Sequence, residues 1–223
     1  MNGITHFLVG IVIVLVVWHF FSDEWAEDKE WARRKVFSIK NRSVSIISIL
    51  RIFITSIAAF FSHAIVDGFA IFTYHPWWDQ YPLFNQISKP LMLIAAAIVA
   101  FFALNKDIRY AWGIIFSAAF DLWDFSTLNV IMTINPEFNL SPLYLHRFEW
   151  AFIDIFLSWA PNFYQEPLAI LVEVVIIVLL LISWVILMKK WPLPENKQIQ
   201  PRFSILIILY ILFALWFALD SII

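Results

Sequence analysis

The hydrophobic pattern of this chain consists of long apolar runs separated by short polar connections. Six runs are long enough, or nearly so, to cross a hydrocarbon core of about 30 Å as helices that rise about 1.5 Å per residue. They occupy residues 3–22, 52–74, 90–104, 110–131, 167–188 and 203–223. A shorter apolar piece, 148–160, carries Glu149 and Asp154, so we expect an interfacial or re-entrant helix there. The pattern predicts a single all-α integral membrane domain over residues 1–223, a bundle of about six transmembrane helices with one short interfacial or re-entrant helix.

The composition supports a membrane protein and restricts its function. Hydrophobic residues make up 62% of the 223 residues and charged residues 14%, against roughly 45–50% and about 25% in soluble domains. The 12 tryptophans and 23 phenylalanines are of the kind that populates bilayer interfaces. A net charge of -2 argues against a nucleic-acid-binding surface. Because the chain has no cysteine, disulfides, thiolate metal sites and cysteine nucleophiles are excluded.

The distribution of Lys and Arg predicts an orientation. The connections after the first, third and fifth runs hold 12 of these 15 residues, and those after the second and fourth hold only Lys89 and Arg147. The remaining residue, Arg51, is expected at a helix end. The positive-inside rule then places the odd connections in the cytoplasm and both termini outside. The first of them, residues 23–43, mixes both signs of charge, and we expect a solvated helix there. The expected location is therefore the cell membrane, crossed several times.

Ionisable side chains within the apolar runs are energetically costly in a bilayer and indicate a functional site. With this topology they form a layer in its outer half, made up of His6, His63, Asp67, Asp121, Asp124 and Glu173. His63 and Asp67 are four residues apart and Asp121 and Asp124 three, so each pair shares a helical face. Carboxylates and imidazoles that converge from separate helices form metal sites in bundles. The pattern predicts a divalent ion held by these two pairs, with His6 as a further ligand.

Three side chains outside the runs are candidate catalytic residues. His75 follows the second run, and His146 and Arg147 precede the 148–160 piece. Since imidazole titrates near neutral pH, either histidine could transfer the proton or complete the ligand set. Arg147 could orient an anionic head group. In the alternative interpretation, the buried pairs only hydrogen-bond between helices and His75 belongs to an aromatic belt.

Four short motifs resemble those of a known family. They are Thr5-His6 on the first run, Ser62-His63 followed by Asp67 on the second, the pair Asp121 and Asp124, and His146-Arg147. Together they resemble the membrane-bound metal-dependent hydrolase family of prokaryotic inner-membrane proteins. In that family the paired aspartates precede the His-x-x-x-Asp helix, the reverse of the order here. The resemblance implies a metal-bearing site on transmembrane helices and hydrolysis as the reaction.

These observations predict an integral membrane, metal-dependent hydrolase that acts on a lipid-like or phosphate-bearing amphiphile. Zinc suits the imidazole ligands, while an aspartate-rich set also accepts magnesium or manganese. One alternative is a transporter or ion relay that uses the same acids, although the inner half of the bilayer then lacks a continuous polar path. Another is a non-catalytic subunit of a membrane complex. The expected partners are membrane lipids, a lipid-like substrate and, for the last alternative, other subunits.

Overall fold

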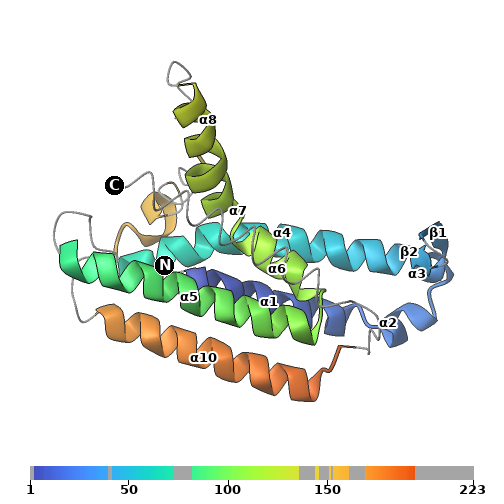
Figure 1. Cartoon of the computed structure of the whole chain (residues 1–223). Helices are drawn as coiled ribbons and strands as arrows, with labels where there is room; N and C mark the ends of the chain where they lie inside the picture. The colour runs from blue at the N-terminus through green and yellow to red at the C-terminus, as the bar shows by residue number, and fades with distance from the viewer. Residues whose placement is uncertain are drawn as a thin grey trace.

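The computed structural model describes residues 3–39, 42–72, 82–135, 144–145, 151, 153–160 and 169–193. Its long helices, α1 (Gly3–Phe20), α4 (Ile46–Gly68), α5 (Pro82–Lys106) and α10 (Ala169–Lys190), lie along a common direction (Figure 1). The shorter helices are α2 (Asp23–Glu27), α3 (Glu30–Arg33), α6 (Tyr110–Ser117), α7 (Ala119–Asp121) and α8 (Asn129–Ile134). A 3-10 segment, η1 (Phe69–Phe72), and two π-helical segments, η2 (Leu122–Leu128) and η4 (Ile153–Leu157), complete the helical structure. The predicted helical class is confirmed over this part of the chain.

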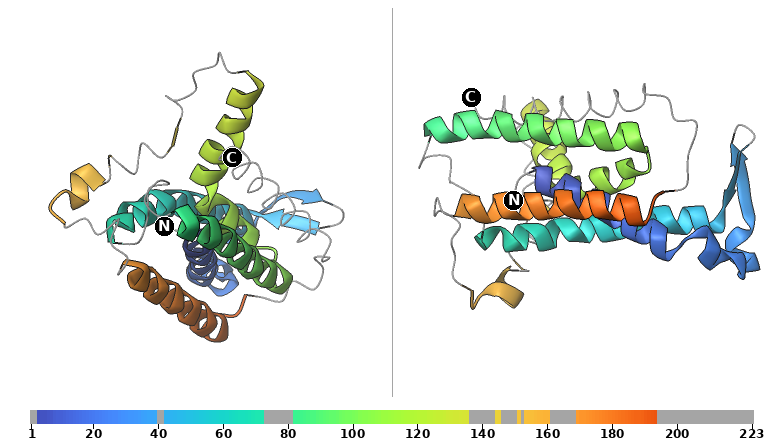
Figure 2. Two further views of the ribbon diagram at one scale, coloured as in Figure 1. Left: turned by 60° about the vertical axis from the view of Figure 1, so that its left-hand side comes forward. Right: turned by 90° about the horizontal axis from the view of Figure 1, so that it is seen from below.

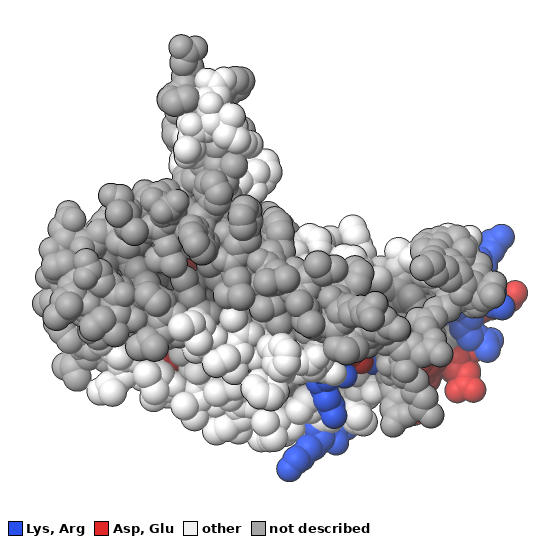
Figure 3. Space-filling model, in the orientation of Figure 1, with Lys and Arg blue, Asp and Glu red and all other residues white. Residues whose placement is uncertain are grey.

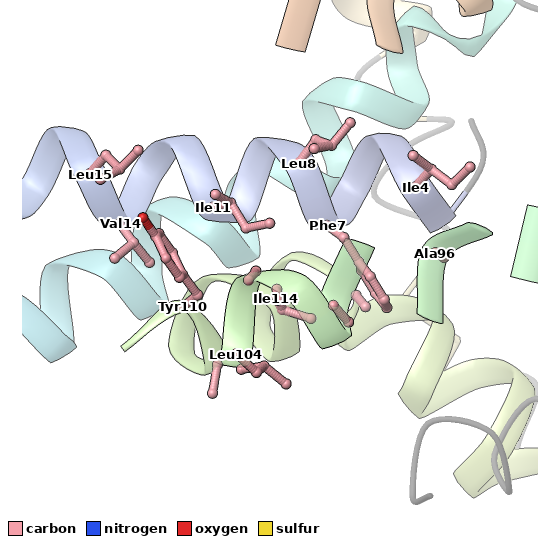
Figure 4. Packing of buried hydrophobic residues seen from close by; sticks show 14 of the residues in the cluster. Ile4, Phe7, Leu8, Ile11, Val14, Leu15, Ala96, Leu104, Tyr110 and Ile114 are labelled. Carbon is pink, nitrogen blue, oxygen red and sulfur yellow. The ribbon is translucent and has the colours of Figure 1, made fainter. Parts of the chain in front are cut away.

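Helix α1 is the centre of the bundle. It contacts α4, α5, α6 and α10, and because it is apolar on nearly every side it can be covered all round. In Figure 4 its side chains pack against α5 and α6, and the residues of this core include Phe7, Leu8, Ile11, Val14, Leu15, Ala96, Leu104, Tyr110 and Ile114. The polar residues Thr5 and His6, near the N-terminus of this apolar helix, are therefore enclosed by its neighbours.

Two glycines allow α1 and α6 to approach closely. A Cβ atom on Gly10 would collide with the carbonyl oxygen of Gly113, and a Cβ atom on Gly113 would collide with the carbonyl oxygen of Gly10. Small residues at a crossing point are the usual means by which apolar helices bring their backbones together. The contact fixes the positions of α1 and α6 relative to each other.

Within the described residues, two helices, α4 and α10, are long and apolar enough to cross a membrane. The six complete spans expected from the sequence are not supported. The apolar parts of α1 and α5 are shorter, at Ile4–Phe20 and Ile94–Lys106. The run 110–131 is divided among α6, α7, η2 and α8 because the helix is interrupted at Ala118. The run 203–223 lies outside the described residues. Of the 148–160 piece, residues 151 and 153–160 are described, and they include the π-helical segment η4.

The surface of α10 has the character of a lipid-facing helix. Only 6% of its most apolar window is buried in the molecule. Large aliphatic side chains such as Leu171, Val175 and Leu179 are each more than half exposed. Exposed apolar surface of this extent is unfavourable in water and favourable in hydrocarbon. This helix therefore supports membrane association.

The prediction of a solvated helix between residues 23 and 43 is wrong in part. The chain forms α2 and α3 and then an antiparallel pair of strands, β1 (Lys35–Ile39) and β2 (Arg42–Ser45), in which Ile39 pairs with Arg42. The aromatic and β-branched residues Val36, Phe37 and Val44 favour strands, and the charge pattern concealed this preference. Figure 2 shows the hairpin extending from one end of the helical bundle.

Basic residues from three connections gather at that same end. The hairpin lies there (Figure 1). The C-terminal end of α5, with Lys106, and that of α10, with Lys189 and Lys190, lie there too. In Figure 3 the visible Lys and Arg side chains are concentrated in this region, and the rest of the described surface on that face is almost uncharged. Among the described residues, Lys and Arg therefore gather at this end, together with the acidic residues of α2 and α3, and we call it the basic end.

Candidate metal centre

Three side chains from two helices meet around one point in the half of the bundle that is remote from the basic end. His6 lies near the start of α1, and His63 and Asp67 lie in the last turns of the antiparallel helix α4. The distance from His6 Nε2 to Asp67 Oδ1 is 3.0 Å, and that from His63 Nε2 to Asp67 Oδ2 is 3.1 Å. One carboxylate thus presents a separate oxygen atom to each imidazole.

The two imidazoles are stacked and enclosed. Their ring centroids are 4.1 Å apart with an interplanar angle of 11°, and the side chains are 1% and 0% exposed. The Phe120 ring packs against His63 at a centroid distance of 4.7 Å. The Nε2 atoms of both rings face the same carboxylate. The ligand atoms of His6, His63 and Asp67 all lie within 4.8 Å of one another, so this buried group could hold a metal ion.

A main-chain carbonyl determines which nitrogen of His63 carries a proton. The Nδ1 atom lies 2.7 Å from the carbonyl oxygen of Ser117, the last residue of α6. A carbonyl oxygen only accepts hydrogen bonds, so Nδ1 is the donor, and in the neutral ring the lone pair of Nε2 faces Asp67. Two acceptors 3.1 Å apart repel each other unless a cation, either a proton or a metal ion, lies with them. The same carbonyl-to-imidazole contact orients histidine ligands in metal sites.

His6 makes the need for a cation clearer. Among the described residues, neither ring nitrogen of His6 has a hydrogen-bond partner with acceptable geometry, although its Nε2 atom is 3.0 Å from Asp67. A proton on Nε2 would lie in the ring plane and would not point at that oxygen. Leaving a buried imidazole without hydrogen bonds is unfavourable. A tetrahedral zinc ion with bonds of about 2.0–2.1 Å separates its ligands by roughly 3.3 Å, which is comparable with the 3.0 and 3.1 Å from each imidazole to its own oxygen of Asp67.

The two aspartates of the second predicted pair have different surroundings. Asp121 Oδ1 is 4.0 Å from His63 Nε2, and its side chain is 38% exposed, so Asp121 borders the centre on a side that reaches the surface.

Asp124 is buried and lies in the π-helical segment η2. One of its carboxylate oxygens accepts a hydrogen bond from the backbone N–H of Leu145 at 2.9 Å. This contact ties η2 to the loop at residues 144–145. Burial raises the pKa of Tyr144 in that loop, and the charge of Asp124 raises it further, so the phenol stays protonated.

The other sequence candidates fall in different places. Glu173 is buried on α10, whereas His75, His146 and Arg147 lie outside the described residues. Sequence reasoning missed Ser117, because the group that contacts His63 is a main-chain carbonyl and carries no residue signature. The interruption after Ser117 and the adjoining π-helical segment were also missed; such segments often accompany functional sites.

Comparisons of this chain with protein-family models, with curated proteins and with solved structures give no match. The resemblance to the membrane-bound metal-dependent hydrolases stays a prediction. The functional argument therefore depends on the geometry of His6, His63 and Asp67 and on the character of the helices that carry them.

Proposed function

We propose that His6, His63 and Asp67 bind one divalent metal ion and that the protein is an integral membrane hydrolase for a lipid-like or phosphate-bearing amphiphile. The observation that carries the proposal is the pair of stacked imidazoles whose Nε2 atoms lie 3.0 and 3.1 Å from the two oxygens of one buried carboxylate. In a neutral His63, the Ser117 contact leaves the Nε2 lone pair available for coordination. The reaction class is that of the family which the sequence motifs resemble.

The residues around the centre suit hydrolysis. Two imidazoles and a carboxylate are a typical catalytic zinc set, and three protein ligands leave a fourth position open. A divalent ion in this group would supply Lewis acidity and lower the pKa of a bound water molecule. Asp121 is partly exposed and lies 4.0 Å from His63 Nε2, so its carboxylate would be available as a general base beside such an ion. The catalytic contributions of His75, His146 and Arg147 remain predictions.

The surroundings of the ligands favour an amphiphilic substrate. Phe61 and Ile65 lie two residues before and after His63 on α4, and they are 60% and 44% exposed. The outer face of this helix is therefore apolar at the level of the metal ligands, as expected for a helix in contact with acyl chains. A multi-pass arrangement with the basic end in the cytoplasm places the centre in the outer half of the membrane.

Metal analysis of the purified protein tests the first part of the proposal. We expect about one equivalent of zinc in the wild-type protein and less than about a tenth of that in His6→Ala, His63→Ala and Asp67→Asn, because each change removes one of three ligands. His19→Ala is the matched control, since His19 is on the same helix as His6 but stacks on Trp191 near the basic end. Absence of metal from the wild-type protein, or equal contents in all variants, contradicts the proposal.

Hydrolysis assays test the second part. Zinc-loaded protein in lipid nanodiscs is offered p-nitrophenyl phosphodiesters and p-nitrophenyl esters that carry an alkyl chain. We expect release of p-nitrophenol by the wild-type protein and no release by Asp67→Asn. Asp121→Asn should retain the metal and lose roughly 10²–10⁴-fold in rate, the usual contribution of a general base. Equal rates in the wild-type protein and Asp67→Asn would show that the release does not come from this centre.

A further inference from the structure

A second polar site lies at the opposite end of α1 from the metal centre. A partly open cavity of about 370 Å³ is lined by the end of α1, the start of α2, the first half of α4 and the end of α10. Its lining combines both signs of charge with aromatic rings and includes Trp18, Asp23, Glu24, Arg51, Lys190 and Trp191. None of these residues contributes to the proposed hydrolytic centre, so the cavity calls for a separate explanation.

Arg51 is the buried cation of this cavity. Its side chain is 7% exposed, its Nε atom donates to the carbonyl oxygen of Phe21 at 2.5 Å, and its Nη2 atom donates to Asp23 Oδ1 at 2.8 Å. A guanidinium group has five N–H donors, and these are its two acceptors among the described residues. A buried guanidinium with further donors beside a cavity is suited to a ligand with several oxygen atoms, such as a phosphate.

The opposite wall of the cavity has the features of a bilayer interface. The His19 ring stacks on Trp191 with centroids 3.9 Å apart, and the Lys190 ammonium lies 5.7 Å from the centroid of Trp191. The apolar helices α1 and α10 end here, and the basic end of the molecule begins. Tryptophan and lysine at the end of an apolar helix are typical of the head-group level of a membrane.

The charges of the lining balance, because Arg51 and Lys190 are positive and Asp23 and Glu24 are negative. Because Asp23 already pairs with Arg51, an anionic head group would add a negative charge beside Glu24 without bringing a positive charge to balance it. A head group that carries a phosphate and an ammonium group matches both signs, since the phosphate can bind Arg51 and Lys190 while the ammonium faces Glu24 and Asp23.

We propose that this cavity binds the head group of a zwitterionic phospholipid, with acyl chains that lie along the exposed apolar face of α10. The same phosphate-and-ammonium chemistry occurs in free phosphoethanolamine, so the test includes both sources. This lipid would occupy the basic end of the molecule and would not be the substrate of the metal centre. Its binding is therefore independent of whether the centre holds zinc.

Native mass spectrometry of detergent-purified protein provides the test. The probes are dioleoyl phosphatidylethanolamine, dioleoyl phosphatidylglycerol and phosphoethanolamine, each added to delipidated protein. We expect the phosphatidylethanolamine complex to form at least roughly threefold more tightly than the other two complexes. Lys190→Gln and Glu24→Gln should each weaken it by about two- to fivefold, the effect of removing one partly exposed ion pair.

Matched controls separate this site from general surface charge. Lys189→Gln and Glu27→Gln remove neighbouring exposed charges that do not line the cavity, and both should bind phosphatidylethanolamine like the wild-type protein. Equal or tighter binding of phosphatidylglycerol overturns the zwitterionic assignment. Equal binding of free phosphoethanolamine overturns the assignment to a lipid. Equal losses in the lining and control variants overturn the cavity as the binding site.

Discussion

At the scale of single residues, the proposed centre depends on the protonation of His6 and His63. Both imidazoles present Nε2 to Asp67, and a nitrogen that carries a proton cannot coordinate a metal. Protons compete with the metal for these nitrogens, so the affinity should fall as the pH decreases. We expect zinc affinity at pH 5.5 to be at least roughly tenfold weaker than at pH 7.5 by equilibrium dialysis. An affinity that does not change with pH would be inconsistent with imidazole ligands.

The same residues show how far a sequence can specify a site. The four-residue spacing of His63 and Asp67 predicts a shared helix face, and the structure confirms their contact at 3.1 Å. His6 joins them because α1 and α4 run antiparallel, so the expectation that these residues share one layer was a usable signal. The Ser117 carbonyl was not predictable, because every residue has a carbonyl group and its availability depends on where α6 ends.

At the scale of elements, the crossing of α1 and α6 positions both halves of the centre. Gly10 lies one helical turn after His6, and Gly113 lies one turn before Ser117, so displacing either helix moves a ligand or the group that orients one. Gly10→Ala and Gly113→Ala should each destabilise the fold by about 3 kcal/mol, at the upper end of overpacking, because the colliding atoms are backbone atoms.

The measurement for this prediction is thermal unfolding together with zinc content. Both alanine variants should show a lower Tm and reduced zinc. Ile115→Ala, a change to an exposed side chain on the same helix α6, should leave the zinc content unchanged. Normal zinc content in the two glycine variants would mean that the crossing does not position the centre.

The sequence was least informative about where helices are interrupted. The run 110–131 is apolar enough to suggest one continuous span, but the helix is interrupted at Ala118 and continues as a π-helical segment from Leu122. No proline or glycine marks the interruption, since Gly113 lies inside α6. The interruption coincides with the packing of Phe120 against His63 and Phe60. Tertiary contacts of this kind decide where a uniformly apolar segment bends, and they are not visible in its pattern.

At the scale of the whole molecule, the described structure separates a basic end from a buried polar centre. The hairpin and the C-terminal ends of α5 and α10 lie at the basic end, while η1 lies at the other end of α4 (Figure 1). If α4 and α10 cross the membrane, these two ends must face different compartments. Because positive charge is retained in the cytoplasm, the hairpin should face inward.

Single-cysteine labelling can test this arrangement without background, because the chain has no cysteine of its own. Val36→Cys on β1 and Lys189→Cys on α10 should react with a membrane-impermeant maleimide only after the cells are permeabilised. Phe69→Cys on η1, at an exposed position, should react in intact cells. Reaction of all three variants from one side would show that α4 does not cross the bilayer. The centre of His6, His63 and Asp67 would then not lie within the membrane, and a substrate could not enter it from the lipid.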